Sequence, residues 1–130
     1  MGLRSVDAPR ERPAPSSYLV QRSGDSEQRR HLSGLTLVVA VKPGCDGCRD
    51  FVEGEHDLGE AVNVVVVAAL DDPAWEATDV VVSAGLWRDL EIRSAPFYVL
   101  VDAARALVVA EGSVFAPAQV AEEIAQFIGK

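Results

Sequence analysis

The sequence has few cysteine and histidine side chains that could hold a zinc ion or an iron–sulfur cluster. The chain of 130 residues has two cysteines, Cys45 and Cys48, and two histidines, His31 and His56. Two cysteines exclude a four-cysteine iron–sulfur centre within one chain. A structural zinc site needs about four ligands, and neither histidine has a paired spacing, so we expect both to be solvated. The sequence therefore predicts no bound metal and no other cofactor.

Long apolar runs are missing as well. No stretch reaches the ~20 residues that a transmembrane helix needs. Residues 1–17 contain no continuous apolar segment of the kind found in secretory signals. We therefore expect a soluble, cytoplasmic protein with no membrane partner. An apolar content of 48% is enough for one ordinary core, which favours a single domain.

The main part of the chain, residues 34–130, does not carry a net positive charge either. Residues 1–33 hold six arginines against four acidic residues, a net charge of +2, whereas residues 34–130 hold six basic against sixteen acidic residues, a net charge of −10. An acidic surface repels phosphates, and a few arginines near the start are too sparse to reverse this. The charge pattern thus argues against binding to nucleic acid.

The amino-terminal part of the chain has few apolar side chains that could be buried. Residues 1–16 combine three prolines with arginine and serine, and we interpret them as a flexible tail that can be removed without loss. The domain itself is expected to span 17–130. The short apolar stretch YLV predicts a first edge strand near 17–22, followed by a turn.

Two continuous apolar runs predict buried strands. They cover residues 35–41 (LTLVVAV) and residues 62–70 (VNVVVVAAL), and both are rich in β-branched side chains. Strands of this kind are covered on both faces of a sheet. Joining them in parallel requires a crossover, for which residues 45–59 are available.

The second half of the chain predicts a helix, a hairpin and a final helix. Helical spacing of Leu86, Trp87 and Leu90 indicates a helix within 73–91, although the preceding DVVVS fits either a short strand or a helix start. Trp75 and Trp87 are expected to be core or rim aromatics. The hairpin and the final helix are predicted at residues 97–101 paired with 106–111, and from Pro117 to a Gly129 cap.

The cysteine pair in KPGCDGC directly follows the first buried strand. At a strand-to-helix junction, the sulfur of Cys45 would lie where unpaired amide groups stabilise a thiolate, with Cys48 one turn further. Cys45 could then attack a partner's disulfide and Cys48 could resolve the mixed disulfide. Two other interpretations stay open: an inert or static structural pair, and a metal site shared across a dimer.

A proline stands just before the predicted hairpin, in RSAPFYVLVD. Proline lacks the donor that a strand needs, so Pro96 fits either as the first residue of a strand or in a special turn. A cis Ala95–Pro96 bond would turn the chain sharply and leave the backbone of Ala95 available to an extended substrate segment. A trans proline that starts the strand is the alternative.

Taken in order, these features resemble the thioredoxin superfamily over roughly residues 17–128. The order is strand, Cys-x-x-Cys, helix, buried strand, helix, proline-started hairpin and amphipathic helix. The resemblance implies an α/β thioredoxin-like fold, with a central mixed sheet of four to five strands and helices on both faces.

The resemblance also implies roles for particular residues. Cys45 would be the nucleophile, Cys48 the resolving thiol and Pro96 a cis proline facing them, with Gly44 and Ala95 contacting the substrate. On this basis the expected activity is that of a redoxin-branch thiol-disulfide oxidoreductase, acting on a protein or small thiol partner.

The sequence departs from the thioredoxin pattern at several positions. Gly44 replaces the usual aromatic before the first cysteine, Asp46 and Gly47 replace Gly-Pro, and Val39 stands where a buried acid is usual. A negative charge at Asp46 would disfavour a neighbouring thiolate. The motif of peroxidatic cysteines is absent. These departures motivate a second hypothesis, a thioredoxin-fold protein-binding module whose cysteine pair is structural.

Overall fold

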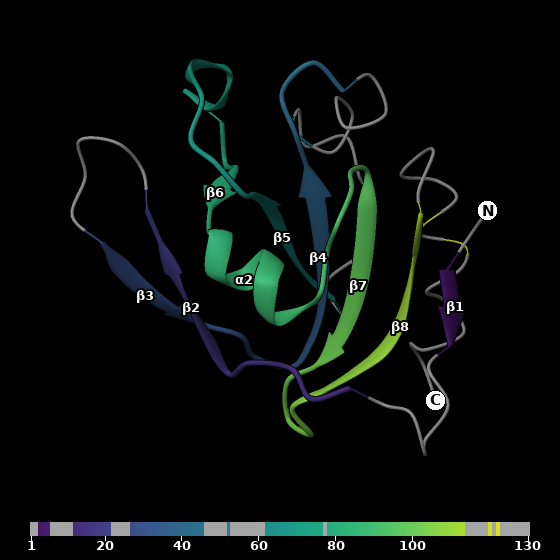
Figure 1. Ribbon diagram of the computed structural model, residues 1–130. Helices are drawn as coiled ribbons and strands as arrows, with labels where there is room; N and C mark the ends of the chain where they lie inside the picture. Colours follow the sequence, from purple (N-terminus) through teal and green to yellow (C-terminus); the bar gives the residue numbers. More distant parts are fainter. Residues whose placement is uncertain are drawn as a thin grey trace.

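A mixed β-sheet forms the centre of the molecule (Figure 1). The computed structural model describes residues 3–5, 12–21, 27–45, 52, 62–76, 78–113, 120 and 122. The sheet has six strands in the order β1-β8-β7-β4-β5-β6, and a separate sheet contains β2 and β3. The strands are β1 (Leu3–Ser5), β2 (Ser17–Val20), β3 (Gln28–His31), β4 (Leu35–Val41), β5 (Asn63–Ala68), β6 (Val81–Val82), β7 (Phe97–Asp102) and β8 (Leu107–Ser113).

β4 is the central strand and is buried on both faces. Leu37, Val39 and Val41 belong to one apolar cluster, which we call core A, whereas Val38 and Ala40 belong to a second cluster on the other face, core B. All five side chains are fully buried. Because successive side chains of a strand point to opposite faces, a strand with both faces covered has no polar alternation. The buried strand predicted over 35–41 is confirmed.

The two neighbours of β4 run in opposite directions. β5 is parallel to β4, with Val41 opposite Ala68, and β7 is antiparallel, with Ala40 opposite Phe97. The parallel pairing predicted for the two buried strands is therefore confirmed. This arrangement brings the carboxyl ends of β4 and β5 and the amino end of β7 to the same end of the sheet.

β5 ends earlier than the strand predicted over 62–70. Leu70 lies beyond the ladder and is 75% exposed. The side chain of Asp72 then accepts a backbone hydrogen bond of 2.8 Å and caps the 3-10 helix η3 (Pro73–Trp75). A proline and a capping carboxylate end the strand, because both favour a turn over continued pairing.

A short strand and a helix follow η3. The stretch DVVVS supplies both, since Val81 and Val82 form β6 and Ser83 caps helix α2 (Ala84–Asp89) by accepting a bond of 3.2 Å from the Leu86 nitrogen. Leu86 and Leu90 are fully buried in core B. The helix predicted within 73–91 is present, although it is short.

The predicted hairpin is confirmed as β7 and β8, which pair antiparallel. At the turn, the side chain of Asp102 accepts a hydrogen bond of 3.3 Å from the Arg105 nitrogen. The aromatic rings near this sheet behave as expected: Trp75 is 3% exposed within core A, and Trp87 packs partly buried on core B.

Helical residues contact both faces of the sheet. α2 packs on core B, whereas the described helical residues on core A are Val52 and Val120. The final helix predicted from Pro117 to Gly129 lies outside the described residues, apart from buried Val120 and exposed Glu122. The α/β architecture is thus present with six strands in place of four to five, and full helical cover of core A stays a prediction. In the described ranges, no helix is long and apolar enough to cross a bilayer.

The first predicted strand does not lie at the edge of the central sheet. β2 pairs with β3 in a hairpin of its own. Tyr18 and Val20 alternate inward onto core B, and the nitrogen of Gln21 donates to the Val82 carbonyl at 2.8 Å. The strand predicted near 17–22 is therefore present, but it belongs to the β2–β3 sheet and not to the central sheet. β3 was not predicted, since its four side chains are all polar and exposed.

The amino-terminal residues differ from the predicted flexible tail in two places. β1 pairs antiparallel with β8, and further along Pro13 bridges to Leu107. Ala14 is only 8% exposed. β8 would otherwise present unpaired backbone groups at the edge of the sheet, and this segment covers them. The interpretation of 1–16 as a removable tail is wrong for these residues, whereas the domain boundary at residue 17 stays a prediction.

Arg12 anchors this segment. Its guanidinium Nη2 donates to the Leu90 carbonyl at 2.9 Å, and its Nη1 lies 2.7 Å from a carboxylate oxygen of Glu111. Its Nε lies 3.0 Å from Glu91 but is not aligned for a hydrogen bond, so this contact is electrostatic. The Glu111 side chain is 15% exposed, and removing its partner would leave a largely buried charge.

We expect Arg12→Ala to lower the free energy of unfolding by about 2 kcal/mol, because it removes a charged hydrogen-bond donor from a partly buried network. The matched control is Arg88→Ala. Arg88 is 79% exposed and contacts only the neighbouring Asp89 among described carboxylates, so its loss should cost less than about 0.5 kcal/mol. Urea denaturation measures both. Equal shifts would show that the amino-terminal segment contributes nothing to stability.

Candidate functional site

A tight turn connects β4 to the first cysteine. Gly44 has a φ of +72°, which lies in the left-handed region that favours glycine. A Cβ built at this position would meet no atom within 4 Å, so the backbone angle and not lack of space selects glycine. A tryptophan at this position would cost about 1–2 kcal/mol in backbone conformation. This accounts for the missing aromatic before the cysteine pair.

Cys45 lies at the end of this turn and takes part in a disulfide. The sequence contains one other cysteine, Cys48, which lies outside the described residues together with Asp46, Gly47 and Arg49. The Cys45 side chain is half-buried and packs against core A, which includes Val39 and Val41 of β4. The sulfur therefore has an apolar floor and a partly open upper side.

Ala95 and Pro96 lie at the same end of the sheet as Cys45. The Ala95–Pro96 peptide bond is cis, which is the geometry that the family resemblance implies. Ala95 packs against core A, as Cys45 does. Because Ala40 lies opposite Phe97, the residues just after β4 and just before β7 leave the sheet at neighbouring positions. The structure thus brings together four predicted site residues, namely Gly44, Cys45, Ala95 and Pro96.

The helix predicted to start at the cysteines is only partly described. Val52 is helical and packs on core A, but residues 46–51 and 53–61 lie outside the described residues. The placement of Cys45 at the amino terminus of a helix therefore stays a prediction.

No acidic side chain is buried beneath Cys45 in the described part of the chain. The buried polar residues there are Thr36 and Ser83. Val39 occupies the strand position where the resemblance would place an acid, and it is fully buried in core A. The strand position beneath the turn therefore holds no carboxylate for a proton relay.

Among the described residues, no histidine lies at this site. His31 lies exposed on β3, in the separate hairpin, and His56 lies outside the described residues. Within the described ranges, no three side chains of His, Cys, Asp or Glu cluster closely enough to hold a metal ion.

Sequence reasoning missed Leu70 as a feature of this end of the sheet. It was predicted inside a buried strand, but it follows Ala68, which lies opposite Val41, and is 75% exposed. Trp75 Nε1 donates to the Leu70 carbonyl at 3.2 Å and so fixes the loop. In the sequence, only Asp72 and Pro73 indicate that β5 ends early and that Leu70 is therefore exposed.

Comparison with solved structures defines the fold class. No protein-family model matches the sequence, and no curated protein is similar to it. The thioredoxin domain of a thiol-disulfide oxidoreductase from Bacteroides vulgatus is similar in structure, with a TM-score of 0.65 at 13% identity, covering 97% of this chain and 99% of that chain.

Two further structures agree with this result. StoA from Bacillus subtilis has a TM-score of 0.58 at 13% identity, covering 90% of this chain and 99% of that chain. A thiol:disulfide interchange protein from a Bacteroides species has a TM-score of 0.59 at 15% identity, covering 91% of this chain and 89% of that chain. The chain therefore has a thioredoxin-like fold, as the order of its elements predicted.

We expect Val39→Asp to lower the free energy of unfolding by at least about 3 kcal/mol at pH 7, because core A offers the new carboxylate no partner. Burial raises the pKa of a carboxyl group, so the folded variant favours the protonated form. Its stability relative to the parent should therefore be greatest near pH 4 and fall as the pH rises. Val39→Ala is the control, with a smaller loss that does not change with pH. Thermal unfolding at pH 4 and pH 7 measures the stability of each variant. A loss of stability in Val39→Asp that is the same at both pH values would contradict the prediction.

Proposed function

We propose that the protein is a thiol-disulfide oxidoreductase that exchanges a Cys45/Cys48 dithiol/disulfide with a protein or small thiol partner. The observation that carries the proposal is the disulfide at Cys45, half-buried at the end of the sheet where the cis Pro96 peptide also lies. The likeness to structures of thiol-disulfide oxidoreductases supports it.

The exchange proceeds through a mixed disulfide. In the reducing direction, the Cys45 thiolate attacks one sulfur of the partner's disulfide, and the other partner sulfur leaves as a thiolate. The Cys48 thiolate then attacks the Cys45 sulfur, which forms the Cys45–Cys48 bond and releases the second partner thiolate. Two electrons pass from the protein to the partner, and the partner's thiolates take protons from solvent. The oxidising direction is the reverse.

The partner's segment would lie in extended form along Ala95. This residue precedes β7, and the proline that follows it has no backbone donor, so the Ala95 backbone can pair with an incoming chain. Exposed Leu70 offers an apolar contact at the same end of the sheet. We propose Gly44 and Ala95 as substrate contacts, with no cofactor.

We expect Cys45→Ser to reduce the rate of insulin disulfide reduction to the uncatalysed rate, because the attacking sulfur is lost. Cys48→Ser should keep the first step and accumulate a mixed disulfide with the partner, detectable by mass spectrometry. Turnover that survives in Cys45→Ser would exclude the proposed reaction, provided that the variant is folded by circular dichroism.

A second candidate function is a protein-binding module with a structural disulfide. The glycine turn before Cys45 and the apolar Val39 in the cluster against which Cys45 packs favour this candidate, since neither helps thiolate chemistry. It predicts a reduction potential below about −300 mV and no turnover with any thiol. Capture of a partner would then persist in the Cys45→Ser, Cys48→Ser double variant. Equilibration with glutathione distinguishes the candidates, because a catalytic pair lies between about −270 and −120 mV.

A further inference from the structure

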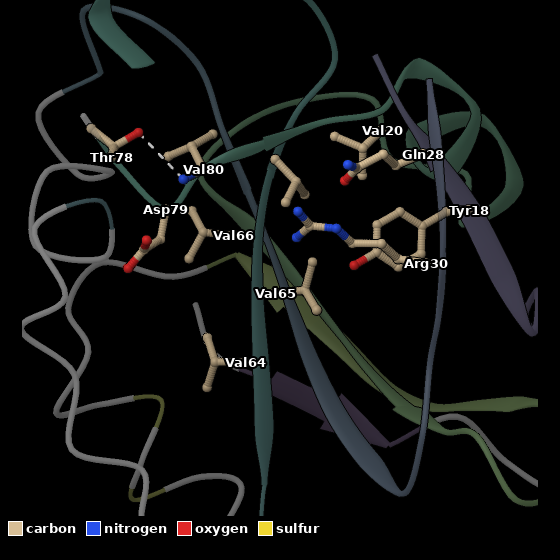
Figure 2. Close-up of a pocket in the computed structure, with 11 residues that line it drawn as sticks. Tyr18, Val20, Gln28, Arg30, Val64, Val65, Val66, Thr78, Asp79 and Val80 are labelled. Atoms are coloured by element: carbon tan, nitrogen blue, oxygen red, sulfur yellow. Dashed lines mark hydrogen bonds between the residues drawn. The ribbon is translucent and has the colours of Figure 1, made fainter. Parts of the chain in front are cut away.

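A second concave site lies beside the first half of β5, whereas Cys45 follows the carboxyl end of β4. It is a pocket of ≈ 780 Å³ between the β2–β3 hairpin, β5 and the segment that precedes β6 (Figure 2). Figure 2 shows Tyr18 and Arg30 on one wall, Thr78 and Asp79 on the other, and the valines of β5 between them. Its residues have no part in the proposed thiol exchange.

Along this pocket, part of the outer edge of β5 has no neighbouring strand among the described residues. β6 pairs with β5 at Val67 and Ala68, and in this parallel register its ladder also uses the Val66 carbonyl. No strand of the described residues pairs with residues 63–65 on that side. The Ser83 nitrogen donates to the Ala68 carbonyl at 2.9 Å, so the backbone groups of Ala68 point away from β4. Because backbone groups alternate along a strand, those of Val64 also point outward, into the pocket.

An unpaired strand edge favours an extended peptide. Its backbone groups need donors and acceptors at the spacing of another strand, which an incoming chain supplies and a small anion does not. The opposite edge of the same sheet, on β8, is covered by β1 and by the bridge at Pro13. The contrast identifies β5 as the edge at which a further strand can be added.

The charges on the pocket wall indicate which peptide fits. No carboxylate of the described residues forms an ion pair with Arg30. Arg30 lies directly opposite Tyr18 in the β2–β3 ladder, so both side chains lie on the same face of the hairpin. Burial raises the pKa of Tyr18, and the Arg30 charge lowers it in part. A neutral phenol has a hydrogen to donate. Arg30 and Tyr18 together can therefore bind a carboxylate.

Apolar contacts surround this pair. Val65 and Val81 line the pocket with Arg30, and Val20 lies beside it on the hairpin. If a strand were added to β5, every second side chain would lie on the face that meets the hairpin. Along this face, one side chain would lie at the carboxylate position and its neighbours would contact these valines. The matching sequence has an acidic residue with aliphatic residues two positions before and two positions after it.

We propose that this pocket binds an extended segment of a partner protein, which pairs with β5 over residues 63–65 and places an acidic side chain between Arg30 and Tyr18. A second copy of this chain fits less well. Pairing two β5 edges would bring two basic hairpins together, each with Arg29 and Arg30 exposed on β3. Charge complementarity therefore favours an acidic partner.

The test is the binding of a fluorescein-labelled peptide, acetyl-Val-Ser-Glu-Ser-Val-amide, to the full oxidised chain, followed by fluorescence polarisation. We expect Arg30→Gln to raise Kd about tenfold, because one charged hydrogen bond is lost. Changing the peptide's Glu to Gln should cause a similar rise, with no further rise when the two changes are combined. Arg29→Gln is the matched control, since Arg29 donates to the Ser17 hydroxyl at 2.8 Å and lies on the alternate face of β3. Its Kd should equal that of the parent.

Three other results would overturn the proposal. One is the absence of measurable binding, or an equal effect of Arg29→Gln and Arg30→Gln. Another is unchanged binding of a peptide that is N-methylated on the nitrogens facing β5, because the ligand would then be an anion alone and not a strand. The third is a dimer in sedimentation that disappears when β5 is blocked by Val64→Pro, because a second copy would then occupy the edge. Cys45→Ser should leave Kd unchanged, so failure of the thiol-exchange proposal does not affect this one.

Discussion

Burial of β4 on both faces is the constraint on which the rest of the structure depends. A strand covered above and below must have a neighbour on each side, since its backbone groups have no other partners. Here the neighbours are β5, parallel, and β7, antiparallel. These directions bring the carboxyl end of β4 and the amino end of β7 to the same end of the sheet (Figure 1). Cys45 follows β4 and the cis Pro96 precedes β7, so both residues lie at that end.

The surroundings of Cys45 follow from local backbone and packing requirements. The positive φ of Gly44 favours glycine and disfavours an aromatic side chain at the rim. Val39 faces core A and so extends the apolar floor beneath the sulfur. An apolar floor disfavours a buried charge, and the proposed thiol chemistry therefore depends on groups at the open side of the site and on the partner.

The two edges of the central sheet differ in how far other segments cover them. The β8 edge is covered by the amino-terminal segment, which Arg12 anchors through Glu111 and the Leu90 carbonyl. The β5 edge is covered by β6 for two residues only, and the β2–β3 hairpin stands beside the uncovered part. We therefore propose two surfaces for extended chains, one at Ala95 and one along β5.

Local side-chain patterns were enough to predict β4, most of β5 and the β7–β8 hairpin, because apolar runs and a proline act over a few residues. They were not enough for the β2–β3 hairpin, the packed segment around Arg12 or the exposed Leu70. The stretch YLV could pack on a face of the central sheet or pair with its edge. Which of these occurs depends on which parts of the sheet α2 and β8 already cover. The sequence by itself determined which segments must be buried and the order in which they occur. Only the tertiary structure decided which edges of the sheet are covered, because edge coverage depends on contacts between segments that are far apart in the chain.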